Sequence, residues 1–318
     1  VLLDAAAARA ASRLQLPRRG SVILLASHQR NTLPATDSDD GESQTWQLAA
    51  AIDVDHVVDL PAGAAWLAER LSSATHGPQG SVVGVVGGRG GAGASVLASA
   101  LAVTAAHAGY RTMLVDADPL GGGLDLLLGR ESYEGARWPD LIAAPTGGVD
   151  GVIYDALPRL GELSLLSWDR GEQQQLAPKT VRKVLAVSRR GSDLVVVDLP
   201  RMPDAAARVA LEATDVVVVV VPAEVRSVAA AARVIAVIRP HCRELRVVVR
   251  VPAPAGLKAA EVAAALRLPL LGTLRGESSL ATSVERGVAP GSTQRGSLSA
   301  LSTSILDQLL PHRRGEPS

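Results

Sequence analysis

The sequence has no phenylalanine and only one cysteine, Cys242, among its 318 residues. A single cysteine excludes a disulfide framework and any zinc site built on cysteine ligands. The apolar runs are short as well: segments such as 216–221 fall far below the ~18 consecutive apolar residues that a membrane span requires. Residues 1–4 carry an early acid and no long apolar core, which predicts that no signal peptide is present. These absences together predict a soluble, cytoplasmic protein.

Neither charge is in excess, since 32 basic residues balance 32 acidic ones. This balance argues against a global field that would attract nucleic acid or an anionic membrane. Only three basic residues are lysines, at positions 179, 183 and 258, so an arginine in place of an expected lysine follows the compositional bias, whereas an alanine there does not. With 47% hydrophobic and 20% charged residues the chain can bury sizeable cores, and its length predicts two domains.

A turn-rich segment at 75–80 without apolar periodicity predicts the domain boundary. We expect a first domain over 1–76, a linker over 77–80 and a second domain over 81–318. In the first region the apolar pattern predicts an α/β domain with a mobile polar loop over 31–42. Its expected strands are 1–3, 21–26 and 56–59, and its expected helices are 5–14, 44–52 and 62–74.

The second region alternates short Val/Leu runs with helical stretches. Continuous apolar strands that alternate with helices predict an α/β fold, a mostly parallel sheet with helices on both faces. The expected strands are 82–86, 112–115, 163–166, 194–197, 216–221 and 245–251, and the expected helices are 95–108, 178–190, 204–213, 224–238 and 257–266.

A glycine-rich loop follows the strand at 82–86 and leads directly into a helix. Glycines let backbone N–H groups converge, and a helix N-terminus adds partial positive charge, so this loop suits a phosphate. The phosphate-loop pattern Gly-x-x-x-x-Gly-Lys-Ser/Thr aligns with Gly88, Gly93, Ala94 and Ser95, which puts Ala94 at the lysine position. A lost charge-assisted hydrogen bond of about 1.5–3 kcal/mol predicts nucleotide binding weaker by roughly one to two decades. Hydrolysis should suffer more, because the charge acts mainly on the transition state.

Acids stand at the ends of two of the expected strands. Asp116 and Asp118 follow the strand at 112–115, and Asp198 follows the strand at 194–197. Ligands of open parallel sheets bind at the carboxyl ends of the strands, so these acids are candidate site residues. The segment ending at Asp198 looks like a Walker B strand, which predicts Asp198 bound to magnesium through water and Ser95 as a direct ligand.

The loop at 89–95, Arg-Gly-Gly-Ala-Gly-Ala-Ser, resembles the deviant Walker A sequence Lys-Gly-Gly-x-Gly-Lys-Ser/Thr of the MinD/ParA family of P-loop NTPases. The resemblance implies weak binding of ATP and Mg²⁺, with Asp118 positioning the attacking water and Asp116 supporting the magnesium shell. Arg89 takes the position of the family's first lysine, which reaches the partner subunit's nucleotide in a homodimer. Arg89 is therefore expected either to lie free beside the loop or to pair with an acid of a second subunit. The implied nucleotide-binding residues are Gly88, Gly90, Gly91, Ala92, Gly93, Ala94, Ser95, Val96 and Arg250, and the implied metal ligands are Ser95, Asp116 and Asp198.

A narrower resemblance is to the CpaE/TadZ-like branch, specifically its actinobacterial septum-site-determining (Ssd) type. It rests on the Ala94-containing loop and on the segment Val-Arg-Val-Pro-x-Pro-x-Gly-Leu at 249–257, where Arg250 replaces the asparagine that commonly reads adenine. The resemblance implies a regulator of septum placement or of Flp/type IV pilus-secretion assembly, with protein partners and recruitment to a septum or pole. A working ATPase that uses Arg89 and a ParA-like DNA-partitioning protein remain alternatives.

The first domain resembles a truncated CheY-like receiver. Asp4 occupies the phospho-acceptor position and Ser27 follows the next strand, but Leu60 replaces the lysine of the fifth strand. The acidic pair of the first strand is absent from the sequence, so we expect a pseudo-receiver without phosphotransfer. At the other end, apolar residues three or four apart over 298–309 predict a helix that packs on its domain rather than on a membrane, since its polar face lacks cations.

Overall fold

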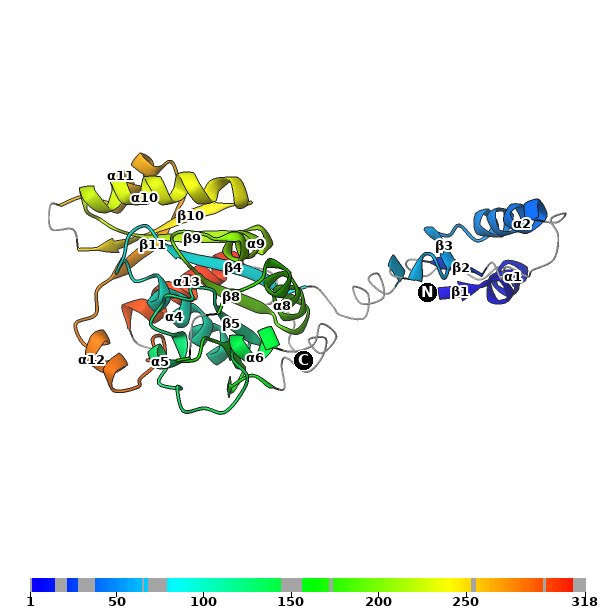
Figure 1. Ribbon diagram of the computed structural model, residues 1–318. Coiled ribbons are helices and arrows are strands. Elements are labelled where there is room, and N and C mark those ends of the chain that lie inside the picture. The colour runs from blue at the N-terminus through cyan, green and yellow to red at the C-terminus, as the bar shows by residue number, and fades with distance from the viewer. Residues whose placement is uncertain are drawn as a thin grey trace. The chain divides into compact units, whose positions relative to one another are not determined.

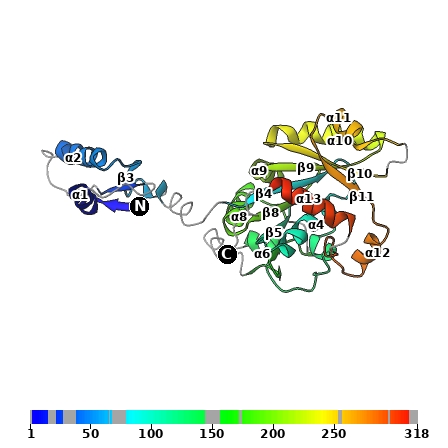
Figure 2. The same ribbon diagram turned by 180° about the vertical axis from the view of Figure 1, so that it is seen from behind.

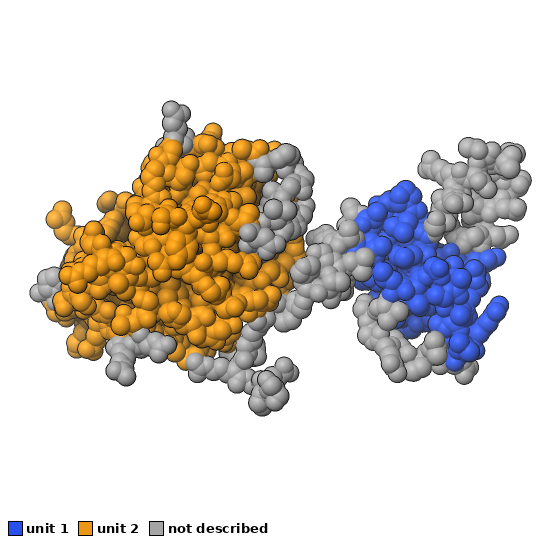
Figure 3. Space-filling view, turned by 90° about the horizontal axis from the view of Figure 1, so that it is seen from below, with its two compact units in different colours: residues 1–77 blue, residues 78–318 orange. Residues whose placement is uncertain are grey.

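The computed structural model describes residues 2–14, 22–27, 38–64, 66–67, 79–143, 156–171, 174–252, 256–293 and 296–310. The chain divides into two compact units, Val1–Gly77 and Pro78–Ser318, which are coloured separately in Figure 3. No helix among the described residues is long and apolar enough to cross a membrane.

The first unit contains a three-stranded parallel sheet in the order β1-β2-β3 and two helices that pack on it. Ala8, Leu24 and Ala49 form one small buried cluster, whereas Trp46 and Trp66 are exposed. Asp4 ends β1 and caps the following helix, because its carboxylate accepts a hydrogen bond from the Ala7 amide at 2.7 Å. The elements are β1 (Leu2–Asp4), α1 (Ala5–Arg13), β2 (Ile23–Ser27), α2 (Ser38–Ala51) and β3 (His56–Leu60).

The predicted loop over 31–42 is wrong in its second half, because α2 begins at Ser38. Residues 31–37 lie outside the described part of the chain. Polar residues such as Ser-Asp-Asp are common both in loops and in the first turn of a helix, so their polarity does not separate the two. The helix expected over 62–74 falls largely on residues outside the described ranges.

The second unit is built on an eight-stranded sheet in the order β11-β10-β9-β4-β8-β5-β7-β6. All neighbouring strands run parallel except β6 and β7, which pair antiparallel. The order puts β4, the strand that leads into the glycine loop, between β9 and β8 in the middle of the sheet. The strands are β4 (Ser81–Gly87), β5 (Thr112–Asp116), β6 (Arg159–Leu160), β7 (Leu163–Leu166), β8 (Leu194–Leu199), β9 (Val216–Pro222), β10 (Leu245–Val251) and β11 (Leu270–Arg275).

Helices cover both faces of this sheet (Figures 1 and 2). On β4, Val83 and Val85 pack with α4 and α13, and Val82 and Val86 face the core beneath α8 to α11, as the period of two in a strand requires. The helices are α4 (Ala94–His107), α5 (Leu124–Leu127), α6 (Trp138–Ala143), α8 (Pro178–Gly191), α9 (Ala205–Ala213), α10 (Val225–Ile238), α11 (Ala259–Leu266), α12 (Leu280–Glu285) and α13 (Ser297–Leu309), with a 3-10 turn at Arg239–His241.

The C-terminal helix α13 packs on its own unit, as the sequence predicts. Leu298 and Ile305 are buried, and the helix contacts α4 and β11. The elements α5, α6, α12, β6 and β11 were not predicted. The three helices have fewer than two turns, which is too short to display a helical period, and β6 and β11 are not continuous apolar runs.

Candidate functional site

The glycine loop lies between β4 and α4, and two of its glycines have conformations that other residues rarely adopt. Gly91 and Gly93 have φ values of 67° and 99°. Gly88 is needed for packing instead, since a Cβ there would lie 2.7 Å from the Ala231 Cβ. Its amide donates to the Val220 carbonyl of β9 at 2.9 Å, which ties the loop to the neighbouring strand.

The loop delivers Ala94, Ser95 and Val96 to the first turn of α4. Gly93 is the N-cap residue and provides no side-chain hydrogen bond to the turn. Uncapped amides at a helix N-terminus need another acceptor, and the helix dipole favours a negatively charged one. The geometry therefore fits a phosphate group, but without the ammonium group that a lysine at position 94 would add.

Two buried carboxylates lie beside this helix end. Asp116 at the end of β5 and Asp198 in β8 are register partners, with 2% and 5% of their surfaces exposed. Burial raises the pKa of each to about 7, and the charge of nearby Asp118 adds to the rise. The Ser95 hydroxyl lies beside Asp198 and opposes this rise, because it favours the charged carboxylate and so lowers the Asp198 pKa. The described residues hold no group of three or more His, Cys, Asp or Glu side chains that could bind a metal. The three expected ligands, both carboxylates and the Ser95 hydroxyl, are oxygen donors of the kind that magnesium prefers.

Asp116 is held in place by its neighbours. Its carboxylate accepts hydrogen bonds from the Leu124 amide at 3.1 Å, the Asp118 amide at 3.2 Å and the Ser167 hydroxyl at 3.3 Å. Its backbone carbonyl accepts from the Trp138 indole N–H at 2.6 Å. Asp118 is half-buried and accepts from the Leu120 amide at 3.1 Å, so it closes its own turn beside the pair.

A further buried acid, Asp125, was missed by the sequence reasoning. Its carboxylate receives two hydrogen bonds from Arg170, at 2.5 and 3.1 Å, and one from Ser167 at 3.3 Å. Arg137 adds a more distant ion pair at 3.9 Å. Ser167 touches both Asp116 and Asp125, so one network fixes β5 and α5 together. An acid in the otherwise apolar segment Leu-Asp-Leu-Leu was the available signal.

A cavity of 430 Å³ opens beside the carboxylate pair. Its walls come from the segment after β5 and from the end of α12, and no Lys or Arg is among the described residues that line it. The lining residues are Ser95, Asp116, Gly121, Gly122, Gly123, Leu124, Leu126, Leu127, Gly129, Glu131, Asp198, Val284, Glu285 and Gly287. The cavity thus reaches the three expected metal ligands and presents acidic groups to a ligand.

Cationic groups lie on the other side of the glycine loop. Arg89 forms an ion pair with Glu224 of the same chain at 3.2 Å, so it does not lie free beside the loop. The Arg250 guanidinium donates to the Gly91 carbonyl at 3.0 Å. Glu224 follows β9 and had not been singled out from the sequence. The loop therefore has one neutralised arginine and a second that approaches from β10.

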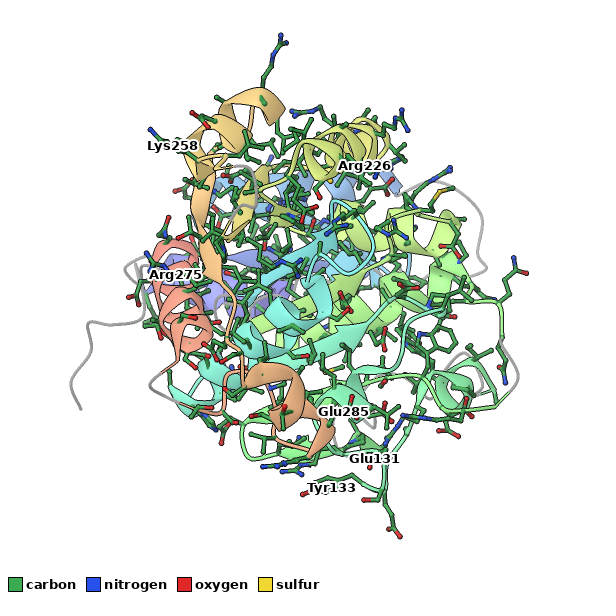
Figure 4. The ribbon with its side chains drawn as sticks, turned by 90° about the vertical axis from the view of Figure 1, so that its left-hand side faces the viewer. Glu131, Tyr133, Arg226, Lys258, Arg275 and Glu285 are labelled. Carbon is green, nitrogen blue, oxygen red and sulfur yellow. The ribbon has the colours of Figure 1, made fainter. Side chains whose placement is uncertain are left out.

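Charged side chains of both signs project from the elements around the site. Figure 4 shows Arg226, Lys258 and Arg275 on the side of α10, α11 and β11, and Glu131 and Glu285 on the side of α5 and α12. Each side also carries the opposite charge: Arg286 follows Glu285 in the sequence, and the Lys258 amide donates to the Glu261 carboxylate.

Comparison with known proteins gives similarities for both units. The family described as "Rv3660c-like, CheY-like N-terminal domain" matches residues 1–82. Over 294 residues the chain is 42% identical to protein Rv3660c of Mycobacterium tuberculosis (strain ATCC 25618 / H37Rv), which covers 90% of this chain and 79% of that protein. The putative septum site-determining protein MinD of Nephroselmis olivacea is 28% identical over 155 residues, or 48% of this chain and 56% of that protein.

Solved MinD structures share the fold of the second unit. The septum site-determining protein MinD with Mg-ADP from Pyrococcus horikoshii OT3 has a TM-score of 0.64 at 15% identity and covers 74% of this chain and 99% of its own. The MinC:MinD cell division complex of Aquifex aeolicus has a TM-score of 0.62 at 22% identity. The match covers 75% of this chain and 99% of that chain. The predicted fold class is confirmed: a mostly parallel, MinD-like P-loop sheet with helices on both faces follows a CheY-like domain. On its identity across 90% of the chain, this protein belongs to the family of Rv3660c.

Proposed function

We propose that this protein is a spatial regulator of the CpaE/Ssd type, which acts in septum placement or in Flp/type IV pilus-secretion assembly through a degenerate ATP site. One observation carries the proposal. Ala94 stands in the first turn of α4 where a lysine would bind phosphate, while the adjacent Ser95 still lies beside Asp198 at the same cavity. A site that keeps its metal half and loses its phosphate-clamping lysine suits a nucleotide-shaped regulator better than a fast enzyme.

In this proposal Mg-ATP binds weakly and hydrolysis is near background. Ser95, Asp116 and Asp198 would hold the magnesium ion, which supplies positive charge next to the phosphates. The uncapped first turn of α4 donates its amides to the phosphates. Asp118 lies close enough to raise the pKa of both carboxylates, and it would position a water molecule if any turnover remains.

The ion pair of Arg89 weakens the case for a working ATPase that relies on this residue. Glu224 neutralises Arg89, and Glu224 is itself held by the Ser227 hydroxyl at 3.0 Å. The case for DNA partitioning is also reduced, since Arg189 in the basic segment of α8 is paired with Asp215 at 2.8 Å. A protein partner is proposed instead, in the way that the Aquifex aeolicus MinD is found in a complex with MinC.

The CheY-like unit is proposed as a contact module rather than a phosphate acceptor. The Asp4 carboxylate caps α1, and Leu60 at the end of β3 provides no ammonium group near it. A capping carboxylate is stabilised as an acceptor of backbone hydrogen bonds. This unit would therefore recruit the protein to a septum or pole through protein contacts.

The test is made in cells of the source organism. The gene is deleted, and septum spacing and the amount of surface pilin are both measured, with a fluorescent fusion of the full chain used for complementation. We expect one of the two traits to change and the fusion to concentrate at septa or poles. Normal septa and normal pilin in the deletion strain would refute the regulatory role. Separately, ATP turnover of the purified protein at the rate of lysine-containing relatives would refute the degenerate site.

A further inference from the structure

The glycine loop has little positive charge of its own to bind a phosphate. Ala94 contributes none, and Glu224 neutralises Arg89. The helix dipole alone is equivalent to about half an elementary charge. A di- or triphosphate carries several negative charges, so a phosphate-binding loop of this composition requires cations from elsewhere in the fold.

Arg250 reaches the loop from β10, two strands away from β4. The side chain extends past the end of β9, and its Nη1 donates to the Gly91 carbonyl at 3.0 Å. The same nitrogen would lie 3.9 Å from a Cβ on Gly93, the residue before Ala94. A guanidinium has five N–H donors, and Arg250 has no acidic partner among the described residues, so most of its donors and its charge are available to a ligand.

Arg201 approaches the same loop from the segment that follows β8. Its guanidinium group would lie 3.6 Å from a Cβ on Gly90. Arg201 is exposed and, within the described part of the chain, has neither an ion pair nor a hydrogen bond. The two guanidinium groups therefore border the glycine loop from different strands, and neither is neutralised.

We propose that Arg250, assisted by Arg201, supplies the phosphate-binding charge that Ala94 does not, and that the ligand class is a nucleoside di- or triphosphate bound through these guanidinium groups. The inference rests on the proposed nucleotide site and assigns its cations. Planar guanidinium groups bind phosphate oxygens with two parallel hydrogen bonds, which an ammonium group cannot do. Neither arginine is among the described residues that line the acidic cavity.

The experiment is a calorimetric titration of the full chain with Mg-ATP and, separately, with inorganic tripolyphosphate in magnesium. The variants are Arg250→Ala, Arg201→Ala and the double variant Arg250→Ala with Ala94→Lys. Arg246→Ala is the matched control. Arg246 lies on the same strand as Arg250, and it forms an ion pair with Glu244 at 2.6 Å. Circular dichroism verifies the folding of each variant.

We expect Arg250→Ala to weaken binding of both probes by about tenfold or more, and Arg201→Ala to weaken it in the same direction. Arg246→Ala should leave affinity within about twofold of the wild type, because its charge is distant and already paired. Lysine at position 94 should restore much of the affinity lost in Arg250→Ala, since it returns the charge to the same loop.

Three results would overturn the inference. If Arg250→Ala tightens binding, the side chain obstructs the site instead of binding phosphate. If the variant loses Mg-ATP but binds tripolyphosphate normally, Arg250 contacts the base. If the wild type binds neither probe at millimolar concentration, the loop has no phosphate site, while the septum and pilin measurements still decide the regulatory role on their own.

Discussion

Replacement of Asp125 by asparagine is expected to be among the most destabilising conservative changes in the second unit. The Asp125 side chain is only 1% exposed and receives both Nη groups of Arg170. Asparagine preserves the shape but removes the charge that both arginines face. Arg170 is 47% exposed and can turn toward water, whereas Arg137 is 10% exposed and cannot.

The expected loss follows from this asymmetry. Breaking a fully buried ion pair costs about 3–5 kcal/mol, and a hydrogen bond to a charged group contributes about 1.5–3 kcal/mol. Because Arg170 regains hydration, we expect a loss near the lower limit of the first range, about 3 kcal/mol. For a domain of this size that corresponds to a fall in melting temperature of about 6–12 °C.

The assay is thermal and urea unfolding of the full chain, followed by circular dichroism. Glu244→Gln is the control. The ion pair between Glu244 and Arg246 is also short, 2.6 Å, but the Glu244 side chain is 48% exposed and the Arg246 side chain is 27% exposed. An exposed pair contributes about 0–1 kcal/mol, so this control should hardly shift the transition. Equal, small losses in the two variants would refute the argument, because burial would then not determine the strength of the pair.

Three further predictions concern the site and its support. Ala94→Lys should tighten Mg-ATP binding roughly tenfold or more, measured by calorimetry, and no gain would mean that the loop cannot direct a lysine at phosphate. Burial raises the pKa of Asp198 from 3.8 to about 7, so the folded state retains a proton that the unfolded chain has lost, and stability falls as pH rises through this interval. Asp198→Asn should therefore raise the melting temperature at pH 8 in EDTA, and an unchanged or lower value would contradict the burial argument. Ile305→Ala should destabilise the protein by about 2–5 kcal/mol in urea unfolding, because Ile305 is fully buried on the inner face of α13; a loss below about 1 kcal/mol would mean that the helix is not docked.

The parts of the fold that were predictable are those specified by local pattern. Runs of valine and leucine identified the parallel strands except β11, and acids at strand ends drew attention to Asp116 and Asp198, because parallel strands bring their carboxyl ends to one edge. The start of α2 was assigned incorrectly because its first turn is polar, and polarity is shared by loops and helix N-termini.

The pairings of the arginines were not predictable in this way. Glu224 is 135 residues from Arg89, and Gly91 is 159 residues from Arg250. These contacts arise from the order of the strands, which brings the ends of β9 and β10 next to the loop after β4. The residue that each arginine contacts depends on how far its side chain extends across this edge of the sheet. The hydrophobic period of the sequence carries no information about that distance.

The burial of the tryptophans gives each unit its own optical signal. Trp46 and Trp66 of the first unit are 64% and 40% exposed, whereas Trp138 and Trp168 of the second are 0% and 8% exposed. Iodide should therefore quench emission from the CheY-like unit and leave the blue-shifted emission of the P-loop unit. Because the Trp138 indole donates to the backbone of Asp116, that protected emission also reports on the carboxylate pair without an added label.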